Sequence, residues 1–269
     1  MTEDVAPEDL AVRVGSMLFT MVDPNRGHEV AYNRWYERDH FYGGCLVGPW
    51  LFAGRRFVAT RALKDLRFPA DSPFAEPVDA GSYLAVYWIH AGHVGEHLKW
   101  AGEQVRWLYG VGRGFAERTH AHTGLYDLVS VAYRDEDPVP LELSLDHHFA
   151  GLAVVVSEPA TEGPVPALEE TARTTLLAAG SPVASCSSWE VRASARARDA
   201  KVPMALGSEG GSDDRVVQLL FLDGEPAGAF DACRDYAGAV DAAGAARVTF
   251  CAPFLPTEIG TDRYTDELW

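Results

Sequence analysis

The residue types best suited to proton chemistry on a flat apolar molecule are concentrated between Tyr32 and His40. The segment reads Tyr-Asn-Arg-Trp-Tyr-Glu-Arg-Asp-His. On an α-helix Tyr32, Tyr36 and His40 share one face, and Trp35 and Asp39 flank them. An imidazole can move a proton near neutral pH, and a phenol can hydrogen-bond a carbonyl or enolate oxygen. The spacing therefore predicts acid/base work by His40, with Tyr32 and Tyr36 orienting the oxygen. The alternative is a helix face packed on its sheet, with His40 capping the helix end.

Other side chains along the chain can join such a site. Asp127 interrupts the apolar face of an expected strand, and a carboxylate there needs a partner, for which His40 and Arg56 are the candidates. Asp127 is thus a further candidate catalytic residue. The alternative is a strand-edge carboxylate in water. The side chains expected to contact a ligand are Trp35, Arg56, Trp88 and His90.

The sequence also contains one string of potential metal ligands, His-Ala-Gly-His-Val-Gly-Glu-His at 90–97. It includes the H-x-x-E-H pattern of inverted zinc peptidases, and two histidines four residues apart can bind zinc. The string falls at a strand-to-helix junction, where an acidic residue complements the helix dipole, so we expect no metal site. Glycine-rich nucleotide loops and a GxSxG elbow are absent, so we expect no cofactor.

The elements that must position these residues follow a repeated order. Strands are expected over 13–22, 50–61, 82–90 and 125–134, with helices over 27–42 and 93–119. After a charged, proline-bearing linker at 135–140, strands are expected over 149–156, 183–193, 215–222 and 247–254, with helices over 166–179 and 226–243. Loops at 65–81 and 201–213 occupy matching places. The repetition predicts an α+β fold of two tandem ferredoxin-like βαββαβ units, residues 1–140 and 141–269.

Packing completes this expectation. Both helices of such a unit lie on one side of its sheet, which leaves the other side bare. Two sheets packed face to face cover each other, so we expect an intramolecular pseudo-dimeric α+β barrel. The long loop at 65–81 is a candidate flap over a pocket, or else a passive insertion. The tail 258–269 is expected to cross the surface, anchored by Tyr264 and Trp269.

The segment 32–40, followed by Gly48-Pro49 and the strand with Arg55 and Arg56, resembles the EthD family of the dimeric α+β-barrel superfamily. That family shows an F-x-x-W-Y/W-x-x-x-H helix before a Pro-Gly-bearing strand, whereas this chain has the order Gly-Pro. The resemblance covers about residues 13–134 and implies pocket-facing roles for Trp35 and His40. Tyr36 matches the second aromatic position. The helix expected in the second half lacks these residues, so the resemblance implies one degenerate copy and one site. Superfamily members include cofactor-free monooxygenases, isomerases, cyclases, dehydratases and haem enzymes.

The charge of the chain limits the classes of partner that it can bind, and its cysteines indicate its redox state. Lys plus Arg number 23 against 39 Asp plus Glu, and the formal charge of -16 repels phosphate backbones and anionic membranes. We therefore expect no nucleic-acid or membrane partner. The four cysteines are widely separated, which favours reduced thiols. With no secretion signal visible, a cytoplasmic location is expected, as a monomer or homodimer.

These observations favour a cofactor-independent enzyme that transfers a proton, in an elimination, dehydration or isomerisation, on a small hydrophobic, aromatic or polycyclic metabolite. Such an enzyme would be a lyase or an isomerase. The alternatives are a non-catalytic protein that binds a hydrophobic ligand, or a monooxygenase or haem enzyme of the same superfamily. Fold and function are only loosely coupled in such superfamilies, so the side chains of the site must decide.

Overall fold

The computed structural model describes residues 12–192 and 214–269 and shows an α+β protein built on one closed sheet of eight strands. The order around the barrel is β1-β3-β2-β8-β5-β7-β6-β4, and neighbouring strands run antiparallel. The strands are β1 (Val14–Pro24), β2 (Leu51–Val58), β3 (Tyr83–His90), β4 (Arg118–Tyr133), β5 (Gly151–Pro159), β6 (Val183–Val191), β7 (Val216–Leu222) and β8 (Ala246–Pro256). The expected loop at 201–213 lies outside the described residues.

Each half of the chain contributes four neighbouring strands in the same relative order, β4-β1-β3-β2 and β8-β5-β7-β6. The halves meet at two edges. One edge joins β4 to β6 from Tyr126 to Tyr133, and the other joins β2 to β8 through Phe57 and Val58. Because both edges are paired, the two halves enclose a common interior.

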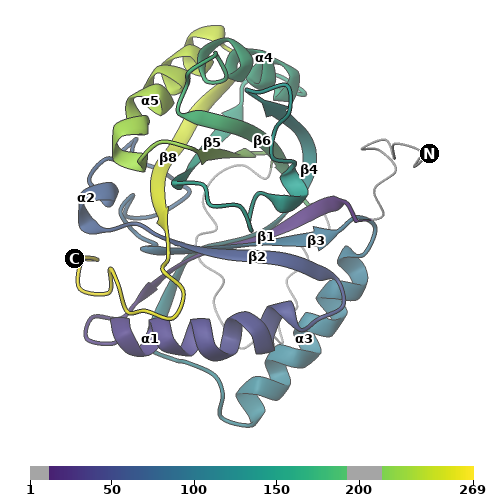
Figure 1. Cartoon of the computed structure of the whole chain (residues 1–269), viewed down its shortest axis with the longest axis vertical. Helices are drawn as coiled ribbons and strands as arrows, with labels where there is room; N and C mark the ends of the chain where they lie inside the picture. Colours follow the sequence, from purple (N-terminus) through teal and green to yellow (C-terminus); the bar gives the residue numbers. More distant parts are fainter. Residues whose placement is uncertain (1–11, 193–213) are drawn as a thin grey trace.

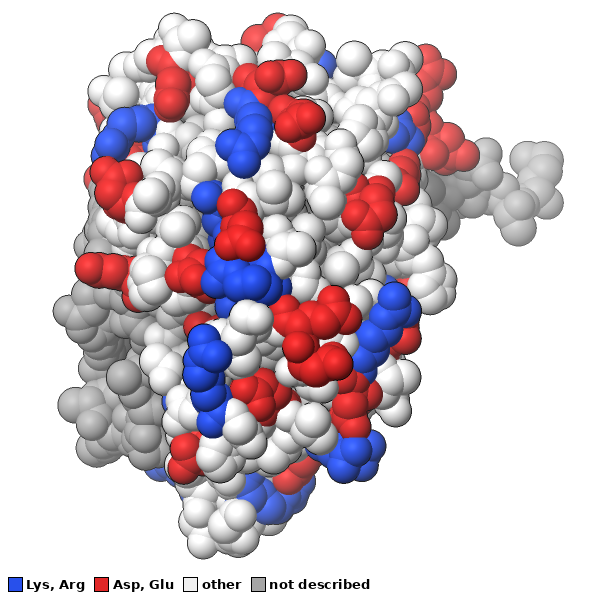
Figure 2. All heavy atoms as spheres, turned by 90° about the vertical axis from the view of Figure 1, so that its left-hand side faces the viewer, with Lys and Arg blue, Asp and Glu red and all other residues white. Residues whose placement is uncertain are grey.

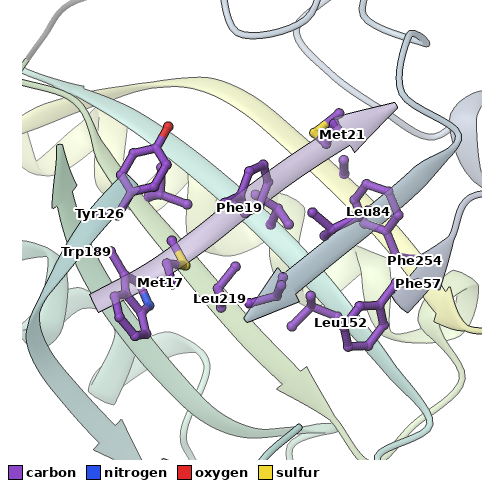
Figure 3. Packing of buried hydrophobic residues seen from close by; sticks show 14 of the residues in the cluster. Met17, Phe19, Met21, Phe57, Leu84, Tyr126, Leu152, Trp189, Leu219 and Phe254 are labelled. Carbon is purple, nitrogen blue, oxygen red and sulfur yellow. The ribbon is translucent and has the colours of Figure 1, made fainter. Parts of the chain in front are cut away.

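That interior is filled by side chains from all eight strands (Figure 3). Successive residues of a strand point to opposite faces, so Met17, Phe19 and Met21 of β1 point inward. The indole of Trp88 stacks on Trp189 from the other half, with ring centroids 5.1 Å apart. The interior is therefore a packed hydrophobic core shared by both halves.

Helices cover the outside of the barrel on two opposite sides (Figure 1). Helices α4 (Val165–Thr175) and α5 (Pro226–Ala243) lie over the second half. Helices α1 (Glu29–Trp35), η2 (Tyr36–Leu46) and α3 (Val94–Gly110) lie over the first half, and short segments α2 (Arg61–Lys64) and η3 (Leu141–Leu143) complete the elements. The aromatic segment identified from the sequence thus lies in the layer between helices and sheet, outside the barrel.

Two features differ from the sequence-based expectation. Strand β4 begins at Arg118 instead of residue 125, so His120 and His122 belong to the strand, and helix α3 ends at Gly110 instead of residue 119. The loop at 65–81 reaches the barrel core through Phe74, which is buried and stacks on His122 with centroids 4.0 Å apart. This loop therefore packs against the barrel core and not against the aromatic helix segment.

The tail crosses the first half as expected. Leu268 is fully buried, and the indole N–H of Trp269 donates to Glu29 Oε1 at 2.7 Å. On the visible part of the face turned toward the viewer in Figure 2, acidic and basic side chains are intermingled. All four cysteines are free thiols, and within the described residues no helix is long and apolar enough to cross a membrane.

Candidate functional site

The aromatic segment forms a helix whose second part is a π-helix. Helix α1 continues without a break into η2, and the backbone N–H of Val47 donates to the carbonyl of Tyr42, five residues earlier. Such i→i+5 helices are rare and are frequent at functional sites. The α-helix expected over 27–42 is therefore correct only for its first part.

The wider turn brings residues five apart into register. The rings of Trp35 and His40 stack, with centroids 4.6 Å apart and planes inclined by 16°. Tyr36 lies 5.7 Å from Tyr32 and 5.3 Å from His40, so the row of two phenols and an imidazole exists. The indole N–H of Trp35 donates to the carbonyl of Arg113 at 2.9 Å, which fixes the ring against the end of α3.

The imidazole of His40 is half-buried between Trp35 and the backbone of Gly44. A Cβ at Gly44 would lie 2.7 Å from Nδ1 and Cε1 of His40, so only glycine leaves room for the ring. Burial lowers the pKa of His40 to about 4, and the Arg118 guanidinium acts in the same direction, against the opposing effect of Asp39. His40 is consequently a neutral imidazole at pH 7 and can accept a proton.

The sequence reasoning missed Arg118 and His120, which begin β4 beside His40. The Cζ of Arg118 lies 4.8 Å from the indole centroid of Trp35, and its Nη2 donates to Tyr109 Oη at 2.6 Å. Its Nε donates to His120 Nε2 at 3.3 Å, which leaves the proton of this imidazole on Nδ1, 2.9 Å from Thr123 Oγ1. Burial lowers the pKa of His120 to about 4. Residues 118–120 show no alternation of apolar and polar side chains, so no strand signal in the sequence could have revealed this pair.

Tyr36 connects the cluster of Trp35, His40 and Arg118, called the His40 group below, to the guanidinium of Arg56. Its hydroxyl lies 3.0 Å from that of Tyr87 in the sheet, and burial raises the pKa of both phenols above the ordinary value. The Cζ of Arg56 lies 4.8 Å from the Tyr36 ring centroid. Burial also raises the pKa of Tyr32 well above its ordinary value, so these phenols stay protonated and can donate hydrogen bonds.

Asp127 has other partners than those expected. Its Oδ1 accepts from Ser16 Oγ and from Arg192 Nη1, each at 2.5 Å. The pairing with His40 or Arg56 is therefore wrong, because Arg192 at the end of β6 lies beside β4 in the closed barrel.

Trp88 and His90 also lie apart from the His40 group. Trp88 is fully buried in the barrel interior, on the opposite face of β3 from Tyr87, and its indole N–H donates to the carbonyl of Leu141 at 3.1 Å. His90 is at the end of β3, with its ring 5.2 Å from that of His93. The structure thus brings together Tyr32, Trp35, Tyr36, His40 and Arg56, but not Asp127, Trp88 or His90.

The histidine string at 90–97 is held by aromatic contacts. His93 stacks on Trp50 at 3.9 Å, and His93 Nδ1 lies 3.7 Å from Glu96 Oε1. His97 is buried, which lowers its pKa to about 4. Within residues 12–192 and 214–269, no three His, Cys, Asp or Glu side chains are grouped to hold a metal ion.

Neither a protein-family model nor a curated protein sequence matches the chain. Solved structures do resemble it. An anthrone oxidase-like protein is 11% identical, with 93% of this chain and 95% of that one covered and a TM-score of 0.53. A mutant chlorite dismutase from Candidatus Nitrospira defluvii is 9% identical, with 97% and 98% covered and a TM-score of 0.51. Identities this low establish a likeness of fold alone.

Proposed function

We propose that the protein is a cofactor-independent enzyme that transfers a proton on a small hydrophobic, aromatic or polycyclic carbonyl compound, in an elimination, dehydration or isomerisation. The observation that carries this proposal is the neutral imidazole of His40, stacked on Trp35 and adjacent to Arg118. A neutral imidazole can accept a proton, an indole offers a flat apolar surface, and a guanidinium stabilises a developing oxyanion.

In this proposal His40 removes a proton from a substrate carbon that is conjugated with the carbonyl group. The carbonyl oxygen gains negative charge, which Arg118 stabilises, while the hydroxyls of Tyr36 and Tyr32 orient it. Trp35 forms the apolar wall. A positioned acid or base contributes about 10²- to 10⁴-fold to a rate, and one preorganised charge-stabilising donor contributes about 10²- to 10³-fold. His120 holds Arg118 in place, because its Nε2 accepts a hydrogen bond from Nε of Arg118.

We also propose that the chain is a tandem fusion of two EthD-like units, residues 1–140 and 141–269, with a degenerate second copy. The repeated strand order and the paired edges support this reading. Seven of the nine histidines lie in the first unit, and the other two, His147 and His148, are exposed residues before β5.

The described part of the second unit lacks side chains that are suitably placed to hold a haem. Haem iron is held by His, Cys, Met or Tyr side chains. The second unit contains two histidines, His147 and His148, and both are exposed before β5. Cys233, Tyr236 and Cys251 are fully buried in the packed core between helices and sheet. These residues do not fit a haem. An absorption spectrum of the purified protein checks this reading independently.

Anthrone is a suitable probe for the proposed activity, because one similar structure is described as anthrone oxidase-like and anthrone has an acidic CH₂ beside two rings. Under argon in D₂O, the protein should accelerate exchange of the CH₂ protons, measured by NMR. His40→Ala should lower the protein-dependent rate by about 10²-fold or more. Gly44→Ala should also lower it, since the added Cβ displaces the imidazole.

The matched control is His28→Ala, because His28 is exposed at the start of the same helix. It should leave the exchange rate unchanged. Saturable anthrone binding without accelerated exchange would favour the non-catalytic alternative. Oxygen consumption in air, with anthrone converted to an oxidised product, would favour a monooxygenase.

A further inference from the structure

Arg56 is a buried guanidinium without a carboxylate partner among the described residues. It is 5% exposed, and the only hydrogen bonds of its side chain to described residues join Nη1 to Oδ1 of Asn33 at 2.9 Å and to the carbonyl of Asn33 at 3.5 Å. Its Nη2 is buried and has no hydrogen-bond partner. A guanidinium keeps its positive charge, and an unpaired buried charge destabilises a folded protein. An anion at Nη2 would remove this cost.

A second donor without a partner lies next to it. The hydroxyl of Tyr83 is buried and makes no hydrogen bond, and the Tyr83 ring centroid is 5.1 Å from Cζ of Arg56. Burial raises the pKa of Tyr83 to about 12, so the hydroxyl keeps its proton. The pair presents two donors without partners, which suits a carboxylate or an anionic oxygen.

The carboxylates that face Tyr83 are all engaged elsewhere. Glu29, Glu37 and Asp262 each raise the pKa of the Tyr83 hydroxyl through their charge. Glu37 accepts from the backbone N–H of Gly260, Glu29 accepts from Trp269, and Asp262 forms an ion pair with Arg34. None of them is paired with Arg56.

The C-terminal tail closes this position. The carbonyl of Arg56 accepts from the N–H of Thr257 at 3.1 Å, and Asn33 Nδ2 donates to the carbonyl of Thr261 at 2.9 Å. Asn33 thus links the guanidinium to the tail. The end of the tail is held by Trp269, whose ring centroid lies 4.6 Å from Cζ of Arg26 and 4.4 Å from Nζ of Lys64.

We propose that Arg56 and Tyr83 form a subsite for the carboxylate of an aromatic ligand, which enters when the tail lifts. Tyr36 joins this subsite to the His40 group, because its ring contacts both Arg56 and His40. The inference deepens the proposed function by naming the substrate class, and it rests on that function only for the chemistry that follows binding.

The test compares two probes of nearly equal shape, 9-anthracenecarboxylate and 9-anthracenemethanol, by fluorescence titration at pH 7.5. The protein should bind the carboxylate at least about 10-fold more tightly, in line with a charge-assisted pair. Arg56→Gln should abolish this preference, and Tyr83→Phe, which keeps the ring, should reduce it severalfold. The matched control is Arg55→Gln, because Arg55 donates instead to the carbonyls of Leu145 and His147 and should not matter.

Stability distinguishes a binding role from a structural one. Without ligand, Arg56→Gln should melt at the same temperature as the unsubstituted protein or higher, since it removes an unpaired charge. Equal affinity for both probes, or an equal effect of Arg55→Gln, would overturn the subsite. Trp269→Ala should speed association of the carboxylate, and an unchanged association rate would overturn the role of the tail.

The two proposals can fail separately. His40→Ala should retain the carboxylate preference, because the imidazole is not part of the subsite. A carboxylate preference without any proton exchange on anthrone would leave the subsite standing and remove the proposed reaction. Proton exchange on anthrone without a preference for the carboxylate probe would support the proposed reaction and remove the subsite.

Discussion

Replacing His97 by leucine should make the stability of the protein less sensitive to acid. His97 is 2% exposed on α3, and burial alone lowers its pKa from 6.5 to about 4. Between these two values the unfolded chain binds a proton that the folded protein does not, so the free energy of unfolding falls as the pH falls from about 6.5 to about 4. Above pH 6.5 both states are neutral and the contribution vanishes.

The size of the effect follows from the pKa difference. A shift of one unit corresponds to about 1.4 kcal/mol, so His97 should cost the folded state roughly 2 kcal/mol between pH 7.5 and pH 4.5. His40, His120 and His122 have lowered pKa values too, and they add to the acid sensitivity of the unsubstituted protein. His97→Leu should remove the contribution of His97 to this acid-dependent loss of stability.

Urea unfolding followed by tryptophan fluorescence at the two pH values measures this share. At pH 7.5 the leucine variant should be nearly as stable as the unsubstituted protein, since Nδ1 of His97 makes no hydrogen bond that would be lost. The control is His148→Leu, because His148 is exposed. If His97→Leu lost as much stability between pH 7.5 and pH 4.5 as the unsubstituted protein, the burial argument would be refuted.

Two further predictions concern the candidate site. Asp127→Asn should lower the free energy of unfolding in urea by less than about 1 kcal/mol, because the ion pair with Arg192 is partly exposed. The anthrone exchange rate should not change. A tenfold slower exchange would show that Asp127 belongs to the site. The pH profile of exchange should be flat from pH 7 down to about 5 and fall near pH 4, where His40 becomes protonated; a fall centred near pH 6.5 would show that the base is a solvated imidazole.

The fold was largely predictable because its signals are local. Helix α5 was expected over 226–243 and spans those residues, since Pro226 suits a first helical turn and Gly244 adopts the left-handed conformation that ends a helix, with φ at 71°. The start of β4 was missed because four of the five residues at 118–122 carry polar side chains. They form a strand only by pairing with β1, a contact about 100 residues distant in sequence.

The candidate site was predictable only where its contacts lie within one helix. The row of Tyr32, Tyr36 and His40 follows from spacing, and it is present. The π-helix and the stack of Trp35 on His40 did not follow, because α-helical spacing does not place residues five apart in contact. The ion pair between Asp127 and Arg192 could not be predicted from the sequence either, because the two residues are brought together only when the barrel closes.

The low basicity of His40 restricts the substrates that the proposed reaction can use. An imidazole with a pKa of about 4 is always available as a base at pH 7, but it accepts a proton less readily than a solvated imidazole does. It therefore needs a carbon acid whose anion is well stabilised. Arg118 lies beside the Trp35 indole and Arg56 beside the Tyr36 phenol, so the two guanidiniums flank the aromatic surface on which such an anion would rest. The burial that makes His40 a weaker base also keeps water from screening the charges of the two guanidiniums. A weaker base combined with stronger stabilisation of the anion favours conjugated aromatic carbonyl compounds as substrates.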